Sequence, residues 1–292
     1  MIVLATAGFT FTQSNRNAGS EYVAHEWGTF TSVQASDGAL LNWQGVAPAE
    51  LPAFVYSWSR PGLVRMAFPN LSKSEMALQR METPVIYFYG GQGQKVDLTV
   101  RFPKGKITEW YPQPKDVGPS LPGSIWSCSM PMTATNATED SLIRWVFNLL
   151  PQQNSSQAAL PVEKSGNHYF AARETDSAVL RVDPSEESQI STEYEKFLFY
   201  RGIGEFETPL KVTMNAGGEI TLANTGPEVL KDLFLLGVEK GSGNFLHVSK
   251  LAPRETQTFR LDLEKHAMPL SKLGAQLSSD LAKALTSRGL FP

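Results

Sequence analysis

Cysteine is nearly absent from this chain of 292 residues, which contains Cys128 alone. A single cysteine excludes a disulfide within the chain and any metal site built from several cysteines. Cys128 has no histidine near it in sequence, so we interpret it as a small, half-buried side chain in a loop rather than a nucleophile. The four histidines form no His-x-x-x-His or His-x-His pair, so the compact metal signatures are missing.

Concentrated positive charge is also missing. Lys and Arg number 26 against 29 Asp and Glu, which gives a formal net charge of −3, and the basic residues are spread along the chain. Without a basic stripe or tail, we expect no nucleic acid as partner, and binding to anionic membranes is disfavoured. The apolar run Met1–Phe11 is too short to cross a bilayer, so we expect no transmembrane span.

Apolar residues are nevertheless plentiful, at 41% of the chain, and they exclude disorder as a global description. The run Met1–Phe11 has the length of the apolar region of a signal peptide, and Ala5–Ala7 resembles a cleavage site. The positive segment that normally precedes such a region is missing. We interpret residues 1–21 as a clipped export signal or a disordered lead-in, and we expect a periplasmic or secreted protein.

Short segments rich in β-branched and aromatic residues predict an all-β fold. Three of them, Pro84–Tyr89, Lys95–Phe102 and Ile107–Tyr111, are joined by short Gly and Pro turns, which predicts an antiparallel meander. From His168 onward, strands at regular spacing predict an immunoglobulin-like β-sandwich. Leucines four residues apart in Ser271–Ser287 predict a short C-terminal helix.

The stretch 112–160 is rich in Pro, Ser, Gln and Asn, and its one apolar segment, Leu142–Leu150, predicts a short helix or a strand. We interpret the whole stretch as a long loop excursion that covers a site between two β regions. The expected regions are therefore the lead-in 1–21, an N-terminal β region with this excursion at 22–160, a β-sandwich region at 161–265, and a C-terminal helix at 266–292.

The run His25–Thr31 reads His-Glu-Trp-Gly-Thr-Phe-Thr, an unusual combination. Together with Met81–Tyr89, it resembles a family of uncharacterised, exported bacterial proteins that this motif identifies. Further segments resemble the same family, namely Glu109–Pro112, His168–Asp176 and Glu195–Gly202. The resemblance covers nearly the whole chain from residue 22 and implies export, without implying a reaction. It also implies that the natural chain continues past the C-terminal helix.

The motif supplies His25 and Glu26, which with His168 and Glu174 form the expected polar site, and Glu82 adds a further carboxylate. Imidazole and carboxylate ligands suit zinc, iron or manganese, so a divalent metal is one hypothesis. Without a metal, the same residues would serve as general acids and bases. Along a strand His25 and Glu26 point to opposite faces, so only one of them reaches a given site. The alternative is that these histidines are structural.

Arginine and tryptophan side chains are the candidates for holding a ligand. Arg173 and Arg201 would clamp a carboxylate or phosphate, or else form structural ion pairs. Trp27 and Trp110 would stack on a sugar ring, although tryptophan in a β-sandwich usually packs in the core.

Two hypotheses follow from these residues. The first is an exported hydrolase-like enzyme that acts on a glycan or an ester. The alternative is a non-catalytic binding or cell-surface module, in which the same residues form a buried structural network. The Gly-x-Ser-x-Gly elbow is absent, which disfavours a serine esterase. The catalytic candidates are His25, Glu26, Glu82, His168, Arg173 and Glu174, and the substrate-binding candidates are Trp27, Trp110 and Arg201.

Overall fold

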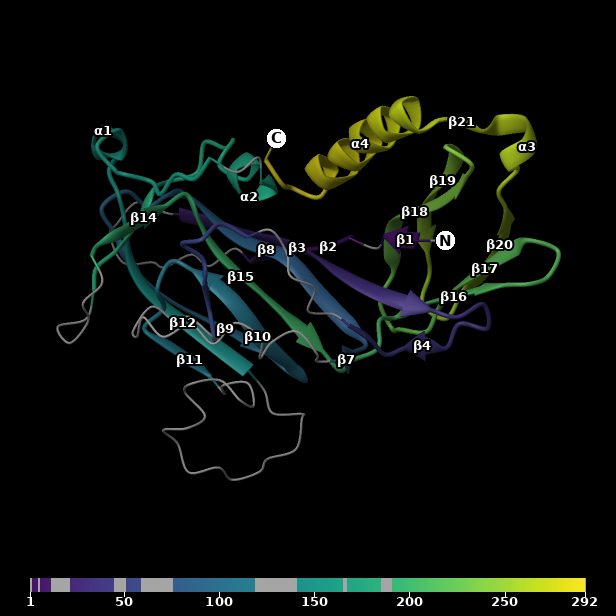
Figure 1. Cartoon of the computed structure of the whole chain (residues 1–292), viewed down its shortest axis with the longest axis horizontal. Coiled ribbons are helices and arrows are strands. Elements are labelled where there is room, and N and C mark those ends of the chain that lie inside the picture. Colours follow the sequence, from purple (N-terminus) through teal and green to yellow (C-terminus); the bar gives the residue numbers. More distant parts are fainter. Residues whose placement is uncertain are drawn as a thin grey trace, which may run out of the picture. The chain divides into compact units, whose positions relative to one another are not determined.

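The computed structural model describes residues 2–4, 6–11, 22–44, 51–58, 76–118, 141–164, 167–184 and 191–291. Within these ranges antiparallel sheets predominate, which confirms the all-β fold class (Figure 1). The chain divides into two compact units. The smaller unit comprises Met1–Gly8, Phe30–Trp43 and Phe206–Pro292, and the larger comprises Phe9–Thr29 and Gln44–Glu205.

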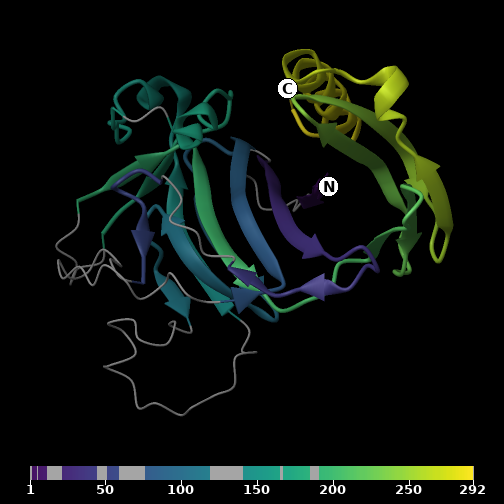
Figure 2. The ribbon, with the colours of Figure 1, turned by 45° about the vertical axis from the view of Figure 1, so that its right-hand side comes forward.

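A seven-stranded sheet runs through the larger unit in the order β2-β3-β8-β15-β10-β6, with β4 paired to the end of β3. Figure 2 shows β3, β8 and β15 side by side at its centre. All eight residues of β15 are buried, as expected for a central strand that is covered on both faces. The strands are β2 (Thr6–Phe11), β3 (Tyr22–Gln34), β4 (Leu40–Leu41), β6 (Tyr56–Ser57), β8 (Gln79–Gly90), β10 (Gly105–Tyr111) and β15 (Phe197–Gly204).

A five-stranded sheet packs on one face of this sheet. Its order is β11-β12-β13-β14, and β9 pairs along β12. Phe88 of β8 lies against Phe147 of β12 with ring centroids 5.0 Å apart, and Tyr200 of β15 lies 6.2 Å from Trp145. The larger unit is therefore a sandwich of two sheets. The added strands are β9 (Lys95–Phe102), β11 (Asp116–Gly118), β12 (Ser141–Leu149), β13 (Leu180–Val182) and β14 (Glu193–Glu195).

The other face of the seven-stranded sheet carries an aromatic cluster. Helix α2 (His168–Ala171) lies over it and places Tyr169 in the cluster, 5.4 Å from the ring of Phe199. The Asn167 side chain accepts a hydrogen bond from the Tyr169 N–H at 2.7 Å and so caps this helix. A second short helix, α1 (Gln152–Ser155), follows β12. The buried members of the cluster are Val55, Val85, Tyr87, Tyr111, Tyr169, Phe197 and Phe199.

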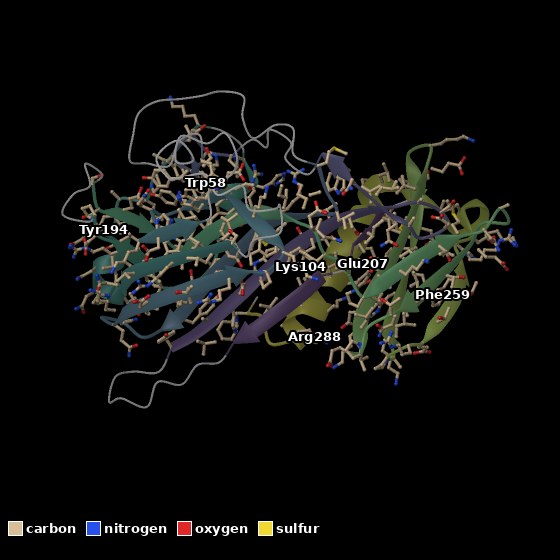
Figure 3. All side chains as sticks on the ribbon, turned by 90° about the horizontal axis from the view of Figure 1, so that it is seen from below. Trp58, Lys104, Tyr194, Glu207, Phe259 and Arg288 are labelled. Atoms are coloured by element: carbon tan, nitrogen blue, oxygen red, sulfur yellow. The ribbon has the colours of Figure 1, made fainter. Side chains whose placement is uncertain are left out.

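The smaller unit is a second sandwich. One sheet has the order β16-β17-β20, the other β1-β18-β19-β21, and leucine, isoleucine and valine side chains from both sheets share one core. Figure 3 labels Phe259, which packs against this core from β20. The strands are β1 (Ile2–Leu4), β16 (Leu210–Met214), β17 (Glu219–Asn224), β18 (Leu230–Glu239), β19 (Ser242–Leu251), β20 (Thr256–Arg260) and β21 (Met268–Pro269).

The predicted C-terminal helix is confirmed as α4 (Leu270–Ser287), which follows the short helix α3 (Leu263–His266). It packs against β19 through Leu273, which is buried. Arg288, just after α4, binds the carboxylate of Asp232 on β18 and so attaches the end of the helix to that strand. His247 of β19 binds the same carboxylate, with 3.0 Å between Nε2 and Oδ1. None of the helices in the described part of the chain combines the length and hydropathy needed to cross a membrane. The remaining pair of strands is β5 (Trp43–Gln44) with β7 (Met76–Ala77).

Some of the expected connections differ from those observed. The three strands of the predicted meander exist, but β8 and β10 both pair with β15, whereas β9 pairs with β12 in the facing sheet. The short turns between them therefore carry the chain from one layer to the other. The predicted excursion at 112–160 contains β12, a central strand of the second sheet, because alternate side chains of Ser141–Leu149 are buried.

The expected boundary between residues 160 and 161 lies inside the larger unit, which extends to Glu205. His168–Ala171 is helical rather than extended. The apolar run at the N-terminus contains β1 and β2, which pair into sheets. Cys128 and the polar residues 12–21 lie outside the described residues.

Candidate functional site

The segments that carry the family resemblance are neighbours in space. His25–Thr31 lies in β3, Met81–Tyr89 in β8, most of Glu195–Gly202 in β15, and Glu109–Tyr111 in β10. These four strands are consecutive in the seven-stranded sheet. Residues as far apart in sequence as 25 and 202 therefore contribute to one continuous surface.

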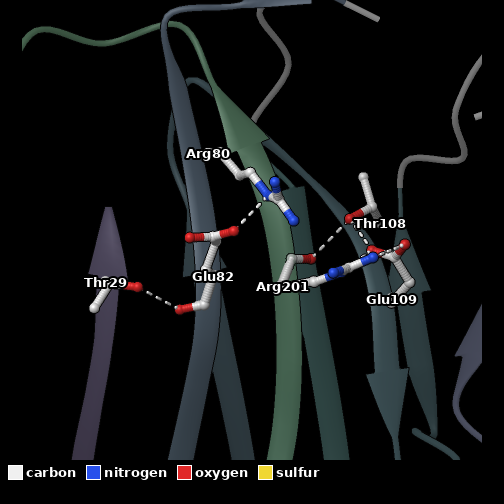
Figure 4. Close-up of polar contacts among 6 residues, drawn as sticks. All are labelled: Thr29, Arg80, Glu82, Thr108, Glu109 and Arg201. Carbon is white, nitrogen blue, oxygen red and sulfur yellow. Dashed lines mark hydrogen bonds and ion pairs between the residues drawn. The ribbon is translucent and has the colours of Figure 1, made fainter. Parts of the chain in front are cut away.

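A row of polar side chains crosses this surface, and Figure 4 shows it. Arg80 and Glu82 of β8 form an ion pair with 2.9 Å between Nε and Oε1. Arg201 of β15 holds Glu109 of β10 with two hydrogen bonds, of 2.8 and 2.7 Å. We name Thr29, Arg80, Glu82, Thr108, Glu109 and Arg201 the polar row.

Two threonines complete the polar row. The Thr29 hydroxyl of β3 donates to the Glu82 carbonyl oxygen at 3.1 Å, which connects β3 to β8. The Thr108 hydroxyl lies 3.3 Å from the Arg201 carbonyl oxygen and also contacts the Glu109 carboxylate. The hydrogen bonds of Thr29 and Thr108 to the carbonyl oxygens of Glu82 and Arg201 each connect neighbouring strands, so the polar row also stabilises the sheet.

The sheet register places the charged members of the polar row on the face that carries the aromatic cluster. Phe199, Arg201 and Ile203 alternate along β15 and therefore share one face. Glu109 is directly opposite Arg201, and Arg80 is directly opposite Ile203, so their side chains lie on that same face. Phe199 belongs to the aromatic cluster. One face thus has an aromatic part under α2 and a polar part beside it.

Irregular pairing between the strands determines the direction of these side chains. The register of β10 against β15 shifts between Ile107 and Glu109, and that of β8 against β15 shifts within residues 199–202. Such bulges redirect side chains locally. Gly202 lies at this point, where a Cβ atom would be 2.1 Å from the Lys106 carbonyl oxygen. Only glycine fits this close approach of two backbones.

Arg173 is held by a buried carboxylate. Its Nε and Nη2 donate to Glu195 at 2.9 and 2.6 Å, and its Nη1 donates to the Pro161 carbonyl oxygen at 2.7 Å. Glu195 is fully buried and also accepts from the Tyr169 hydroxyl at 3.0 Å. The guanidinium lies 5.1 Å from the ring centre of Phe170. All its nitrogens are engaged, so Arg173 positions α2 rather than a ligand.

The opposite face holds a half-buried carboxyl group. Glu26 of β3 accepts a hydrogen bond from the Tyr200 hydroxyl of β15. Burial raises the pKa of Glu26, and its hydrogen bond to Tyr200 opposes that shift. Burial and the nearby Glu26 charge raise the pKa of Tyr200. A carboxyl group with a raised pKa is a recognised feature of acid–base sites and of buried structural networks alike.

His25 lies on the face opposite to Glu26, as the alternation along β3 predicts. It is buried, and its ring lies 5.3 Å from that of Tyr89. Burial lowers the pKa of His25, which favours the neutral ring. Glu26 and His25 therefore cannot act together on one substrate.

The remaining predicted residues do not converge on a single point. His168 and Glu174 are exposed at the two ends of the α2 segment. Trp110 is fully buried, with its ring 5.0 Å from that of Trp58, so it presents no surface for a sugar. Trp27 is half-buried beside the aromatic cluster. In the described ranges, no three His, Cys, Asp or Glu side chains lie close enough together to hold a metal ion.

Sequence reasoning missed three important residues. Arg80, Tyr200 and Glu195 are not among the site residues that the sequence predicts. The signal for Arg80 was available, because it lies two residues before Glu82 and therefore on the same face of β8. Tyr200 and Glu195 gave no such signal, because their partners are 174 and 22 residues away.

The chain matches no protein-family model, no curated protein and no solved structure. The family resemblance of the His25–Thr31 motif therefore stays a prediction. The function has to be inferred from the residues of the site.

Proposed function

We propose that the chain is a non-catalytic module that binds a small molecule or glycan on the face of the seven-stranded sheet that carries the polar row. One observation carries this proposal: partners within the chain hold two of the three candidate catalytic carboxylates, and the third, Glu174, is exposed away from them. Arg80 pairs with Glu82, and Tyr200 binds Glu26. Both predicted ligand clamps, Arg173 and Arg201, bind carboxylates of the protein itself.

The composition of the face supports binding. It combines the half-buried Trp27 and Tyr89 with the charged side chains of the polar row on adjacent strands. Ligand sites typically consist of apolar and aromatic surface with a few placed polar groups. The family resemblance supports an exported, bacterial module that works in the periplasm or outside the cell.

The test compares binding with turnover. The purified chain is screened against a glycan array for binding and against nitrophenyl glycosides and esters for hydrolysis. We expect binding of at least one glycan class without turnover. The proposal would be refuted if the parent hydrolyses one of these substrates and if Glu26→Gln or Glu82→Gln abolishes that hydrolysis without changing the free energy of unfolding.

A hydrolase is the second candidate, and the Glu26–Tyr200 pair is the observation that favours it. Burial raises the pKa of the Glu26 carboxyl group, and a raised carboxyl pKa is a property of the general acids of glycosidases. Against it, Glu26 lies on the face that packs toward the five-stranded sheet, like its partner Tyr200 beside Trp145. The same hydrolysis screen decides between the two candidates.

A further inference from the structure

Arg80 differs from the other arginines of the larger unit's core because its hydrogen-bonding capacity is largely unused. Its contact with a described residue is the ion pair from Nε to Glu82. Arg173 and Arg201, by comparison, each use at least two guanidinium nitrogens on a carboxylate. The Arg80 side chain is only 15% exposed, yet its nitrogens are not among the fully buried, unpaired polar atoms. The Nη edge is therefore unpaired among the described residues, and it is reachable from solvent.

The surroundings of Arg80 suit an anionic ligand. Arg80, Ile203 and Lys106 are directly opposite one another on β8, β15 and β10, so their side chains lie on one face. Ile203 is buried and packs with Ala77, which provides an apolar floor between two cations. In Figure 4 the Arg80 guanidinium points across β15, toward the side of Arg201 and Thr108. A charge-assisted hydrogen bond in such a partly desolvated position is stronger than one in water.

We propose that Arg80 binds the carboxylate of an acidic sugar, with the Nη edge of its guanidinium as the donor. This inference rests on the proposed function and narrows it to glycans that carry a carboxylate. A planar guanidinium presents parallel N–H donors that match the two oxygens of a carboxylate. Glu82 already places one negative charge beside Arg80. A monoanion therefore fits better than a phosphate group, which carries a charge of about −1.5 to −2 at neutral pH.

A glycan longer than one sugar would extend from Arg80 along β8 toward the aromatic side of the face, because Arg80 and Tyr87 are about 23 Å apart along the strand. Arg80 and Tyr87 are seven residues apart on β8, with Glu82 and Val85 between them on that face. Trp27 and Tyr89 are half-buried there. These aromatic rings can pack against the apolar face of a further sugar of the same glycan, while Arg80 binds the carboxylate of the acidic sugar.

The experiment uses the full chain and two probes, p-nitrophenyl β-D-glucuronide and the uncharged p-nitrophenyl β-D-glucoside. Isothermal titration calorimetry measures binding, and absorbance of released nitrophenol measures turnover. Arg80→Gln removes the charge and the Nη donors. Arg101→Gln is the matched control, because Arg101 is an exposed arginine on β9. Arg80→Lys keeps the charge but removes the planar pair of donors.

We expect the parent to bind the glucuronide at least about tenfold more tightly than the glucoside, and Arg80→Gln to abolish that preference. Arg80→Lys should bind the glucuronide several-fold more weakly than the parent, and Arg101→Gln should match the parent. If the parent binds both probes equally, the inference is overturned. This comparison needs no variant, so the inference can be tested even if Arg80→Gln fails to fold. An unchanged preference in folded Arg80→Gln also overturns it.

The outcomes separate this inference from the proposed function. Release of nitrophenol by the parent refutes the non-catalytic function, whether or not Arg80 selects the glucuronide. Binding of neutral glycans without selection for the carboxylate leaves the proposed function intact and refutes the role of Arg80.

Discussion

Replacing Arg173 by alanine tests whether this residue is structural. The change removes the partner of Glu195, which is fully buried and accepts two hydrogen bonds from the guanidinium. An uncompensated buried carboxylate typically costs about 3–5 kcal/mol. The Tyr169 hydroxyl and the Lys196 N–H still donate to Glu195, at 3.0 and 2.8 Å, so we expect a loss toward the lower end of that range.

The assay is urea unfolding followed by tryptophan fluorescence. Trp27, Trp58, Trp110 and Trp145 all lie in the larger unit, so the signal reports mainly on the unit that contains the mutation. The control is Arg181→Ala, which breaks the exposed ion pair with Asp183. Exposed pairs contribute about 0–1 kcal/mol, so the control should remain close to the parent.

A double variant separates the two contributions to the loss of stability, the burial of an unpaired charge and the loss of packing. Arg173→Ala combined with Glu195→Gln removes the buried charge along with its partner, so it should recover part of the loss seen in the single variant. A loss of less than about 1 kcal/mol in Arg173→Ala would refute the reasoning, since it would mean that Glu195 tolerates isolation. Arg173 would then be available for a ligand, as the sequence hypothesis suggested.

Three further substitutions test other parts of the structure by the same unfolding assay. Burial raises the pKa of Glu26 above its ordinary value of 4.5, so this group favours folding fully below pH 4.5 and loses that contribution as the pH rises through the raised pKa. Glu26→Gln should remove this part of the pH dependence, and an unchanged profile would contradict the burial of the carboxyl group. Gly202→Ala should lower the free energy of unfolding by about 1–3 kcal/mol or more, because its Cβ would meet the Lys106 carbonyl oxygen. The control Gly118→Ala, at a position with open space around it, should be nearly neutral. Equal effects of the two substitutions would argue against the close approach of β10 and β15. His168→Ala should change stability by no more than about 0.5 kcal/mol, because this side chain is exposed; a larger loss would place it in a network that the structure does not show.

The local structure was largely predictable from sequence. Alternation of polar and apolar residues in Lys95–Phe102 and clusters of β-branched and aromatic residues elsewhere identified most of the longer strands. Leucines four apart identified α4. These patterns work because a strand or helix buries one face, and the spacing of its apolar residues records which face that is. The opposite orientation of His25 and Glu26 followed from the same rule and agrees with their different partners.

The pairing of strands was not predictable in the same way. The turns after β8 and β9 are short enough for hairpins, yet both carry the chain to the facing sheet. Nothing local distinguishes these two uses of a short turn. One of the two neighbours of β8 is β15, more than a hundred residues later, and Val85 and Phe199 of these strands are buried together in one aromatic core.

In the candidate site too, local features were predictable from sequence and the partners of side chains were not. The sequence by itself determined the all-β class, most of the longer strands and the opposite faces of neighbouring residues such as His25 and Glu26, because these depend on local periodicity. Only the tertiary structure decided which charges meet. It paired Arg201 with Glu109 and Arg173 with Glu195, it buried Trp110, and it left the Nη edge of Arg80 unpaired among the described residues. Ion pairs depend on distances across strands that no local pattern encodes, and for that reason the sequence named the right kinds of residue without identifying their partners.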